Sequence, residues 1–196
     1  MFEKTLKQKR IYKGRIVGLR EDTVRLINGV VSKREIVEHP GAVAVIAITK
    51  DRKLVLIRQF RKPAEKVLLE IPAGLVHKGE RDIDGARREL MEESGYKAGK
   101  IRRVFVGYSS PGYSTELMKF FVATDLKKTA QHCDVDEMIN VKLYPIKQCM
   151  KMLKSGKIRD NKTAIGIMMA NLIPSPSHLT PSPLSTMWRG ALRNQN

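Results

Sequence analysis

The chain has 196 residues, enough for one domain with a buried core and a small appended element. Its formal net charge is +17 and 42% of its residues are hydrophobic, a composition that excludes a largely disordered polypeptide. The longest apolar runs, 41–48 and 164–173, are too short to cross a bilayer, so we expect no membrane association. The charged N-terminus lacks the apolar core of a signal peptide, and the two cysteines show no metal-ligand spacing. We therefore expect a cytoplasmic protein with reduced thiols.

The first forty residues predict a small β element. Residues 15–19 and 23–26 alternate loosely between apolar and polar side chains, and Asn28-Gly29 predicts a tight turn into a further strand at 30–36. His39-Pro40-Gly41 then breaks the pattern. The continuous apolar run 42–48 is typical of a buried central strand.

The rest of the chain alternates strands and helices. Further strands are expected at 53–60, 68–72, 102–108, 119–123 and 140–144. One helix should run from Asp82 to Gly95, with an apolar face against the sheet and carboxylates on another face. Pro145 suits the start of a second helix ending at 156, and Asp160 or Asn161 should cap a third helix that runs through Leu172 and stops before Pro174. Residues 174–196 are rich in proline and serine and predict a flexible tail.

A crowd of glutamates on the first helix carries most of the functional information. Glu89, Glu92 and Glu93 lie within one and a half turns, and Glu80 lies just upstream. Like charges at this spacing cost helix stability, so a cation is expected to balance them. Carboxylate oxygens suit Mg²⁺ or Mn²⁺, which are coordinated in proteins by a few carboxylates together with water and substrate phosphates. The alternative interpretation is a solvated acidic helix face.

The same stretch resembles the signature of the Nudix hydrolases, G-x(5)-E-x(7)-R-E-U-x-E-E-x-G-U, in which U is a bulky apolar residue. Eight of its positions fit fully, and the last holds a tyrosine where an aliphatic residue is commoner. The match comprises Gly74, Glu80, Arg88, Glu89, Leu90, Glu92, Glu93, Gly95 and Tyr96, and we call residues 74–96 the box.

Features outside the box are similar to the ADP-ribose pyrophosphatase type of Nudix hydrolase. Gln59-Phe60-Arg61 resembles that group's Q-[YF]-R element, and residues 70–74 resemble its E-x-PAG lead into the box. Pro111 lies sixteen positions beyond Gly95, and residues 110–116 resemble its S-P-G-x-[ST]-x-E loop. The resemblance extends over about residues 7–173.

This resemblance implies an α/β/α sandwich with a mixed β-sheet, the Nudix fold, plus a small N-terminal β element. The expected organisation is a β element at 1–38 that packs across a homodimer, a catalytic domain at 39–173 and the tail at 174–196. The implied activity is Mg²⁺-dependent cleavage of the pyrophosphate of ADP-ribose to AMP and ribose 5-phosphate, with Mn²⁺ as a possible substitute. A broader nucleoside-diphosphate-sugar or RNA 5′-pyrophosphohydrolase and a non-catalytic ligand sensor are the alternatives.

The basic charge leaves nucleic acid as a less favoured partner. Lysines and arginines concentrate in the first forty residues and at 142–162. A nucleic-acid surface or steering of a polyanionic substrate would each give such a pattern. No helix-turn-helix, zinc-finger or RNP pattern accompanies it, so we favour a solvated basic surface with some steering of a nucleotide-sugar substrate.

The resemblance also assigns roles to residues of the metal site. Glu89 and Glu93 should bind the metal, together with the backbone carbonyl of Ala73. Glu92 is either another ligand or the acceptor that orients the attacking water. Arg88 either contacts substrate or, as we favour, pairs with a box carboxylate.

An acidic loop before the last strand is expected to complete this site. Glu137 is assigned as metal ligand or general base. Some relatives carry a second glutamate two residues earlier, where this chain has Val135, so Asp134 and Asp136 remain alternatives for the base.

Substrate-binding residues are expected in three places. Arg61 and Arg34 are candidates for the phosphates and the adenosine end, since a guanidinium fork matches phosphate oxygens. In the loop after Pro111, Gly112 should let backbone approach the ligand, and Glu116 should accept hydrogen bonds from a ribose hydroxyl. Gly74 is expected to border the same site.

Overall fold

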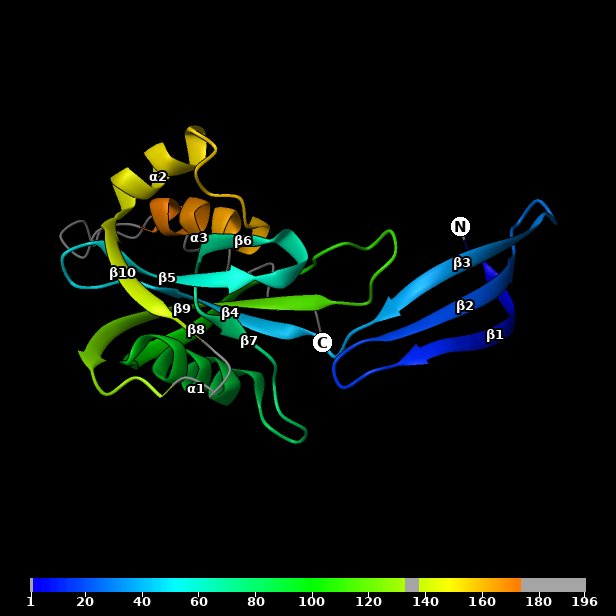
Figure 1. The fold of residues 1–196 in the computed structure, drawn as a ribbon, viewed down its shortest axis with the longest axis horizontal. Helices are drawn as coiled ribbons and strands as arrows, with labels where there is room; N and C mark the ends of the chain where they lie inside the picture. The colour runs from blue at the N-terminus through cyan, green and yellow to red at the C-terminus, as the bar shows by residue number, and fades with distance from the viewer. Residues whose placement is uncertain (1, 133–137, 174–196) are drawn as a thin grey trace.

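The computed structural model describes residues 2–132 and 138–173, which form a three-stranded N-terminal sheet and a larger layered body (Figure 1). The N-terminal sheet is antiparallel and has the order β1-β2-β3. Its strands are β1 (Lys4–Lys13), β2 (Gly18–Arg25) and β3 (Val31–Glu38). The expected turn at Asn28-Gly29 joins β2 to β3, with Gly29 at φ 84° and the N–H of Leu26 donating to the carbonyl of Val30 at 2.8 Å.

The larger body is built on a mixed arrangement of strands. One sheet has the order β7-β4-β9-β8, in which the β4–β9 pair is parallel and the other pairs are antiparallel; the second has the order β10-β5-β6. A short 3₁₀ turn, η1 (Lys62–Ala64), joins β5 to β6. The strands are β4 (Ala42–Ala47), β5 (Lys53–Arg61), β6 (Lys66–Glu70), β7 (Ala73–Gly74), β8 (Tyr96–Tyr108), β9 (Leu117–Lys128) and β10 (Asn140–Pro145).

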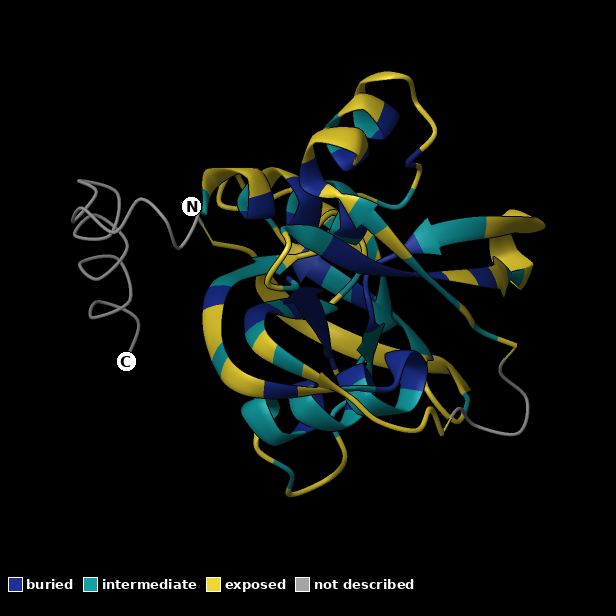
Figure 2. Ribbon diagram, turned by 90° about the vertical axis from the view of Figure 1, so that its left-hand side faces the viewer, coloured by how far each residue is buried: buried dark blue, intermediate teal, exposed yellow. Residues whose placement is uncertain are grey.

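Helices cover both faces of these strands, as expected for an α/β/α sandwich. Helix α1 (Asp82–Ser94) lies on one face, and α2 (Ile146–Lys154) and α3 (Asn161–Leu172) lie on the other (Figure 1). Strand β4 is buried along its whole length because its residues alternate between the two layers. Val43, Val45 and Ala47 join the cluster around Leu90 of α1, while Ala44 and Ile46 join the cluster around Ile167 of α3. Figure 2 shows this dark buried centre enclosed by exposed strand ends and helix faces.

Local signals explain where α1 and α3 begin and end. Gly95 terminates α1 in the left-handed conformation at φ 66°, and its N–H donates to the carbonyl of Met91. Asp160 caps α3, since its side chain accepts from the N–H of Thr163. Both ends agree with the sequence-based prediction. None of the helices in the described ranges is long and apolar enough to cross a membrane.

Several strand limits differ from those predicted. Strand β1 was not predicted, because all ten of its residues are exposed and no apolar alternation marks it. Strands β8 and β9 form a much longer hairpin than 102–108 and 119–123, since charged residues occupy exposed positions along both. Strand β6 begins at Lys66 and ends at Glu70, and the two-residue strand β7 was not among the predicted strands. The predicted tail, 174–196, lies outside the described residues.

Replacing Gly95 by alanine should destabilise the fold by roughly 1–2 kcal/mol, because an L residue is strained at this positive φ. An added Cβ would also lie 3.0 Å from the carbonyl oxygen of Thr129. Urea unfolding measures the effect. Gly112→Ala is the control, since nothing lies within 4 Å of its added Cβ, and it should shift stability by less than about 0.5 kcal/mol. Equal stability of both variants would contradict the capping role of Gly95.

Candidate active site

Helix α1 directs two of its glutamates toward the short strand β7. The side chain of Glu93 accepts a hydrogen bond from the backbone N–H of Ala73 at 2.8 Å. A Cβ added to Gly74 would lie 2.3 Å from the carboxyl carbon of Glu89, so the glycine makes room for that carboxylate. Glu89 and Glu93 are only 9% and 2% exposed. The predicted separation holds, since Ala86 and Leu90 join the apolar cluster while Glu89 and Glu93 contact Arg88 and Ala73. What the sequence did not indicate is that both carboxylates are buried.

Arg88 ties the glutamates of the box together. Its guanidinium donates to both carboxylate oxygens of Glu80 at 3.0 Å, to Glu89 at 2.7 Å and to Glu92 at 2.8 Å. It also donates to the carbonyl of Leu75 at 2.8 Å, which fixes the loop before the helix. The hydrogen bond from Arg88 holds the pKa of Glu80 below its usual value, and the bonded carboxylates raise the pKa of Arg88. One guanidinium thus offsets the repulsion among three carboxylates.

The donor chemistry of this cluster fits a hard divalent cation. Glu89, Glu92 and Glu93 supply carboxylate oxygens, and Ala73, whose N–H bonds Glu93, adds a backbone carbonyl next to that contact. Oxygen donors of this kind suit Mg²⁺ and Mn²⁺. Within residues 2–132 and 138–173, no group of three or more potential ligand side chains is gathered closely enough to hold a metal. Glu89 and Glu92 bond Arg88, and Glu93 bonds the N–H of Ala73. Metal binding at this cluster would require these carboxylates to share or exchange their present partners.

Glu137, the expected further ligand or base, lies outside the described residues. The same holds for Asp134, Val135 and Asp136, so their positions relative to the box stay predictions.

Arg61 is held by a buried carboxylate beside the box. Two of its nitrogens, Nε and Nη2, donate to the two oxygens of Glu70 at 2.8 Å each, and Glu70 is 1% exposed. Lys162 of α3 also donates to Glu70. Burial alone would raise the pKa of Glu70, but the hydrogen bonds and charges of Arg61 and Lys162 outweigh it and lower that pKa. The pKa of Arg61 is raised chiefly by Glu70 and further by the nearby charge of Glu93.

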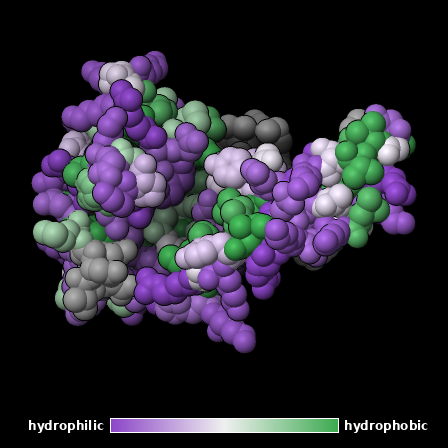
Figure 3. Space-filling view, turned by 45° about the vertical axis from the view of Figure 1, so that its right-hand side comes forward, coloured by the Kyte–Doolittle hydropathy of each residue, from purple (hydrophilic) through white to green (hydrophobic). Residues whose placement is uncertain are grey.

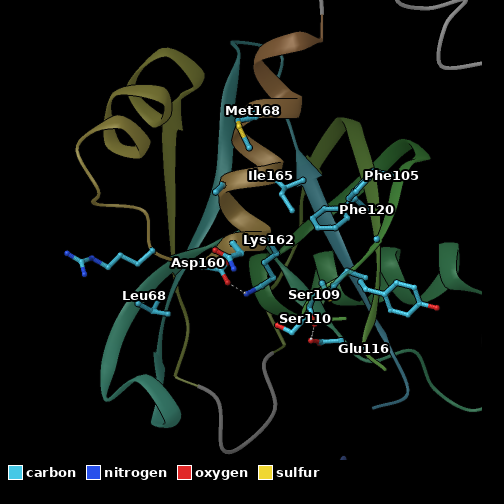
Figure 4. A pocket seen from close by; sticks show the side chains of 16 residues that line it. Leu68, Phe105, Ser109, Ser110, Glu116, Phe120, Asp160, Lys162, Ile165 and Met168 are labelled. Carbon is cyan, nitrogen blue, oxygen red and sulfur yellow. Dashed lines mark hydrogen bonds and ion pairs between the residues drawn. The ribbon is translucent and has the colours of Figure 1, made fainter. Parts of the chain in front are cut away.

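A pocket of about 660 Å³ opens between α3 and the hairpin of β8 and β9 (Figure 4). Its volume is in the range of small-molecule sites. The apolar part of the lining includes Phe105, Met118, Phe120, Ile165 and Met168. The polar part includes Ser109, Ser110, Glu116, Asp160 and Lys162. Apolar surface with a polar rim suits a ring that carries hydroxyl groups.

Glu116, predicted from the loop motif, lies in this pocket. It accepts a hydrogen bond from Ser109 at 2.5 Å, which closes the loop containing Pro111 and Gly112. Pocket-lining Lys162 and Asp160 were not identified as site residues from the sequence. An isolated lysine after a helix cap carries no motif, so only the packing of α3 against β6 could reveal it.

The loop at 109–116 also joins the larger body to the N-terminal sheet. Val37 of β3 donates to the carbonyl of Tyr113 at 2.8 Å and accepts from the N–H of Thr115 at 3.0 Å. Arg34 lies on the same strand but pairs with Glu3 at 2.6 Å. Within one chain, Arg34 therefore belongs to the N-terminal sheet and is not among the residues that line the pocket.

Replacing Glu70 by glutamine should lower stability at pH 7 by roughly 3 kcal/mol, since it removes the buried charge that pairs with Arg61 and Lys162. The pKa of Glu70 is lowered on folding, so its stabilising contribution is present above the ordinary value of 4.5 and is lost as the pH falls below it. The stability difference between wild type and Glu70→Gln should therefore shrink in acid.

Urea unfolding between pH 7 and pH 3 checks this expectation. Glu65→Gln is the matched control, because Glu65 pairs with Lys62 at an exposed position and should change little at any pH. A constant gap between wild type and Glu70→Gln across the range would contradict it.

Comparison with known proteins assigns two parts of the chain. Residues 38–164 match the model of the NUDIX domain, and residues 3–37 match that of the nucleoside diphosphate sugar hydrolase N-terminal domain. The crystal structure of an ADP compounds hydrolase superimposes with a TM-score of 0.78 and 23% identity, covering 88% of this chain and 94% of that one. This structural likeness supports the fold.

Curated relatives are similar over most of the sequence. The chain is 41% identical to the ADP-ribose pyrophosphatase of Bacillus subtilis, covering 87% of this chain and 93% of the relative. It is 42% identical to the methanol dehydrogenase activator of Bacillus methanolicus, covering 90% and 96%. It is 38% identical to the GDP-mannose pyrophosphatase of Escherichia coli K12, covering 75% and 80%. With the complete box, the clustered glutamates and these matches, the chain belongs to the Nudix hydrolase family.

Proposed function

We propose that the protein hydrolyses the pyrophosphate bond of ADP-ribose to AMP and ribose 5-phosphate with Mg²⁺. The observation that carries the proposal is the buried glutamate cluster of the box, in which Glu93 bonds Ala73. A pocket of about 660 Å³ is linked to it through Lys162, which lines the pocket and bonds Glu70, three residues before Ala73. Similarity to an ADP-ribose pyrophosphatase over 87% of the chain supports the choice of substrate.

The metal would be held by Glu89, Glu93 and the carbonyl of Ala73, with Glu137 as a further ligand. These groups offer oxygen alone, which favours Mg²⁺ and admits Mn²⁺. When bound, the divalent ion neutralises phosphoryl oxygens and lowers the pKa of water. The buried positions of Glu89 and Glu93 support the assignment, because buried carboxylates gain most from a compensating cation.

The chain's own residues then orient the reactants. Arg88 holds Glu92 and Glu89 in place, and Glu92 would accept a hydrogen bond from the attacking water and so orient it toward phosphorus. Arg61 uses Nε and Nη2 to bond Glu70, so its third nitrogen, Nη1, would donate to a phosphate oxygen of the substrate. Water adds to one phosphorus, the anhydride P–O bond breaks, and the released proton passes to the base, for which we assign Glu137.

The pocket would hold the sugar end of the substrate. Glu116, which lines the pocket, would accept from a ribose hydroxyl. Gly112 and Pro111 are not among the lining residues, but the free space within 4 Å of the Cβ position of Gly112 would let a ligand approach the loop there. The pocket volume also accommodates a hexose, and the similarity to a GDP-mannose pyrophosphatase supports hydrolysis of other nucleoside diphosphate sugars as a second candidate.

Replacing Glu93 by glutamine should lower kcat for ADP-ribose by about 100-fold or more, because the metal loses a charged ligand while the amide oxygen can still accept from Ala73. AMP release with Mg²⁺ is measured by chromatography. Asp84→Asn is the control, since Asp84 lies exposed in the first turn of α1 and pairs with Arg81. Undiminished turnover by Glu93→Gln would refute the metal assignment.

We also propose that the N-terminal sheet pairs two chains into a homodimer in the cytoplasm. This sheet exposes Leu6, Ile11, Tyr12, Ile16 and Val17, and a three-stranded sheet without its own core needs a partner surface. Figure 3 shows apolar green atoms on this part of the molecule, beside hydrophilic purple ones. In such a dimer, Arg34 of one chain would contact the adenosine end of the substrate bound to the other chain.

Ile11→Glu should raise the dimer dissociation constant at least about tenfold, because it places a charge in an apolar contact. Sedimentation equilibrium should give twice the chain mass of 22.2 kDa for wild type and a mixture for the variant. Val67→Glu, an exposed apolar position on β6, is the control and should stay dimeric. A monomeric wild type at micromolar concentration would overturn the dimer proposal.

A further inference from the structure

The segment that joins β6 to β7, residues 70–73, is held at its first half by α3. We call it the connecting segment. The backbone N–H of Ile71 donates to the hydroxyl oxygen of Thr163 at 2.8 Å, and Thr163 is fully buried. One residue earlier, the ammonium group of Lys162 donates to Glu70. The first turn of α3 therefore reaches this segment from the face of the sheet opposite to the box helix.

The second half of the connecting segment is held by β4 and α1. The carbonyl of Pro72 accepts from the N–H of Val45 at 2.8 Å, and the N–H of Ala73 donates to Glu93 at 2.8 Å. Ala73 lies opposite Ala44 in the ladder, beside the bond from Val45 to Pro72. Along an extended strand, the N–H and C=O of one residue project to the same side. The carbonyl of Ala73 therefore faces the box carboxylates rather than β4.

Thr163 has a single orientation available for this contact. Asp160 accepts from both the backbone N–H of Thr163 at 2.9 Å and its hydroxyl at 2.5 Å. The hydroxyl proton is thus directed to Asp160, which leaves an oxygen lone pair for the N–H of Ile71. Packing is equally close, since a Cβ at Gly166 would lie 3.0 Å from the side chain of Ile71. The helix cap of α3 sets the position of the connecting segment.

Lys162 also affects the position of Arg61, because both residues bond Glu70. Glu70 receives two bonds from Arg61 and a further one from Lys162, which is held in turn by Asp160 at 2.9 Å. Figure 4 shows Lys162 and Asp160 side by side at the edge of the pocket. Removing the lysine would leave Glu70 with Arg61 alone and would free it to shift toward that guanidinium.

We propose that the first turn of α3 is a positioning element for the hydrolase site. Thr163 fixes the connecting segment and hence the direction of the Ala73 carbonyl, and Lys162 fixes Glu70 and hence the aim of Arg61. Neither residue touches the reacting atoms. The inference rests on the proposed function, since it assigns the Ala73 carbonyl to the metal and Arg61 to the substrate.

Thr163→Val removes the hydroxyl and keeps the shape of the side chain. Misplacing one metal ligand should weaken Mn²⁺ binding to the substrate-free protein about tenfold, measured by electron paramagnetic resonance, and should lower kcat about tenfold to hundredfold. Thr163→Ser restores the oxygen and should return both values to within about threefold of wild type. Met152→Ala, a core change on α2, supplies a variant of reduced stability that keeps the hydrogen bond between Ile71 and Thr163.

Lys162→Met tests the second half of the proposal. With Glu70 released from the lysine, Arg61 should lose its aim at the phosphate, so KM for the substrate should rise about tenfold while Mn²⁺ affinity stays within about twofold. Lys162→Arg should recover most of the loss. Lys147→Met, at an exposed position on α2, is the matched control and should behave as wild type.

The outcomes separate this proposal from the proposed function. Wild type that hydrolyses no nucleoside diphosphate sugar overturns the function itself. Active wild type with unchanged Mn²⁺ affinity and kcat in Thr163→Val overturns the positioning role of Thr163. A Met152→Ala variant that loses metal affinity as strongly as Thr163→Val also overturns it, because the loss would then follow stability alone.

Discussion

Three carboxylates of the box share the guanidinium of Arg88, and the rest of the site depends on this contact. Glutamates three and four residues apart on a helix repel each other. Arg88 offsets that repulsion and also bonds the carbonyl of Leu75, so it couples the helix to the loop before it. This loop follows directly on β7, whose Gly74 leaves space for Glu89. The charge balance on α1 and the backbone position of β7 therefore depend on each other.

Two layers of packing hold this arrangement from opposite sides. Strand β4 gives alternate residues to the α1 cluster and to the α3 cluster, so a single strand fixes both helices relative to each other. The connecting segment crosses between those layers beside β4. A catalytic constellation needs this kind of support, because small displacements of ligands cost much activity.

Much of the layered fold could be predicted from the sequence because its signals are local. The apolar run at 42–48, the cap at Asp160 and the stop at Gly95 each depend on neighbouring residues, and each prediction was confirmed. Strand β1 could not be predicted, since its ten exposed residues carry no burial pattern and its pairing with β2 alone defines it.

The candidate site, too, could be predicted from the sequence only in part. Spacing within one helix placed the box glutamates together, but their burial against β7 depends on a strand that the sequence does not mark. Lys162 and Glu70 are 92 residues apart, and Thr163 and Ile71 are equally distant in sequence. Such contacts form only when two layers close on each other, so no local pattern reveals them.

The joint between β3 and the loop at 109–116 has a consequence for how specificity can change. Both hydrogen bonds at Val37 use main-chain atoms, and Tyr113 and Thr115 contribute only their backbone to them. Thr115 is constrained, because its hydroxyl also bonds the backbone of His39, but other side chains in this loop can be exchanged during divergence without removing these contacts to the N-terminal sheet. Substitutions in the loop can therefore change which sugar or base the pocket accepts, while the backbone of the loop keeps its position.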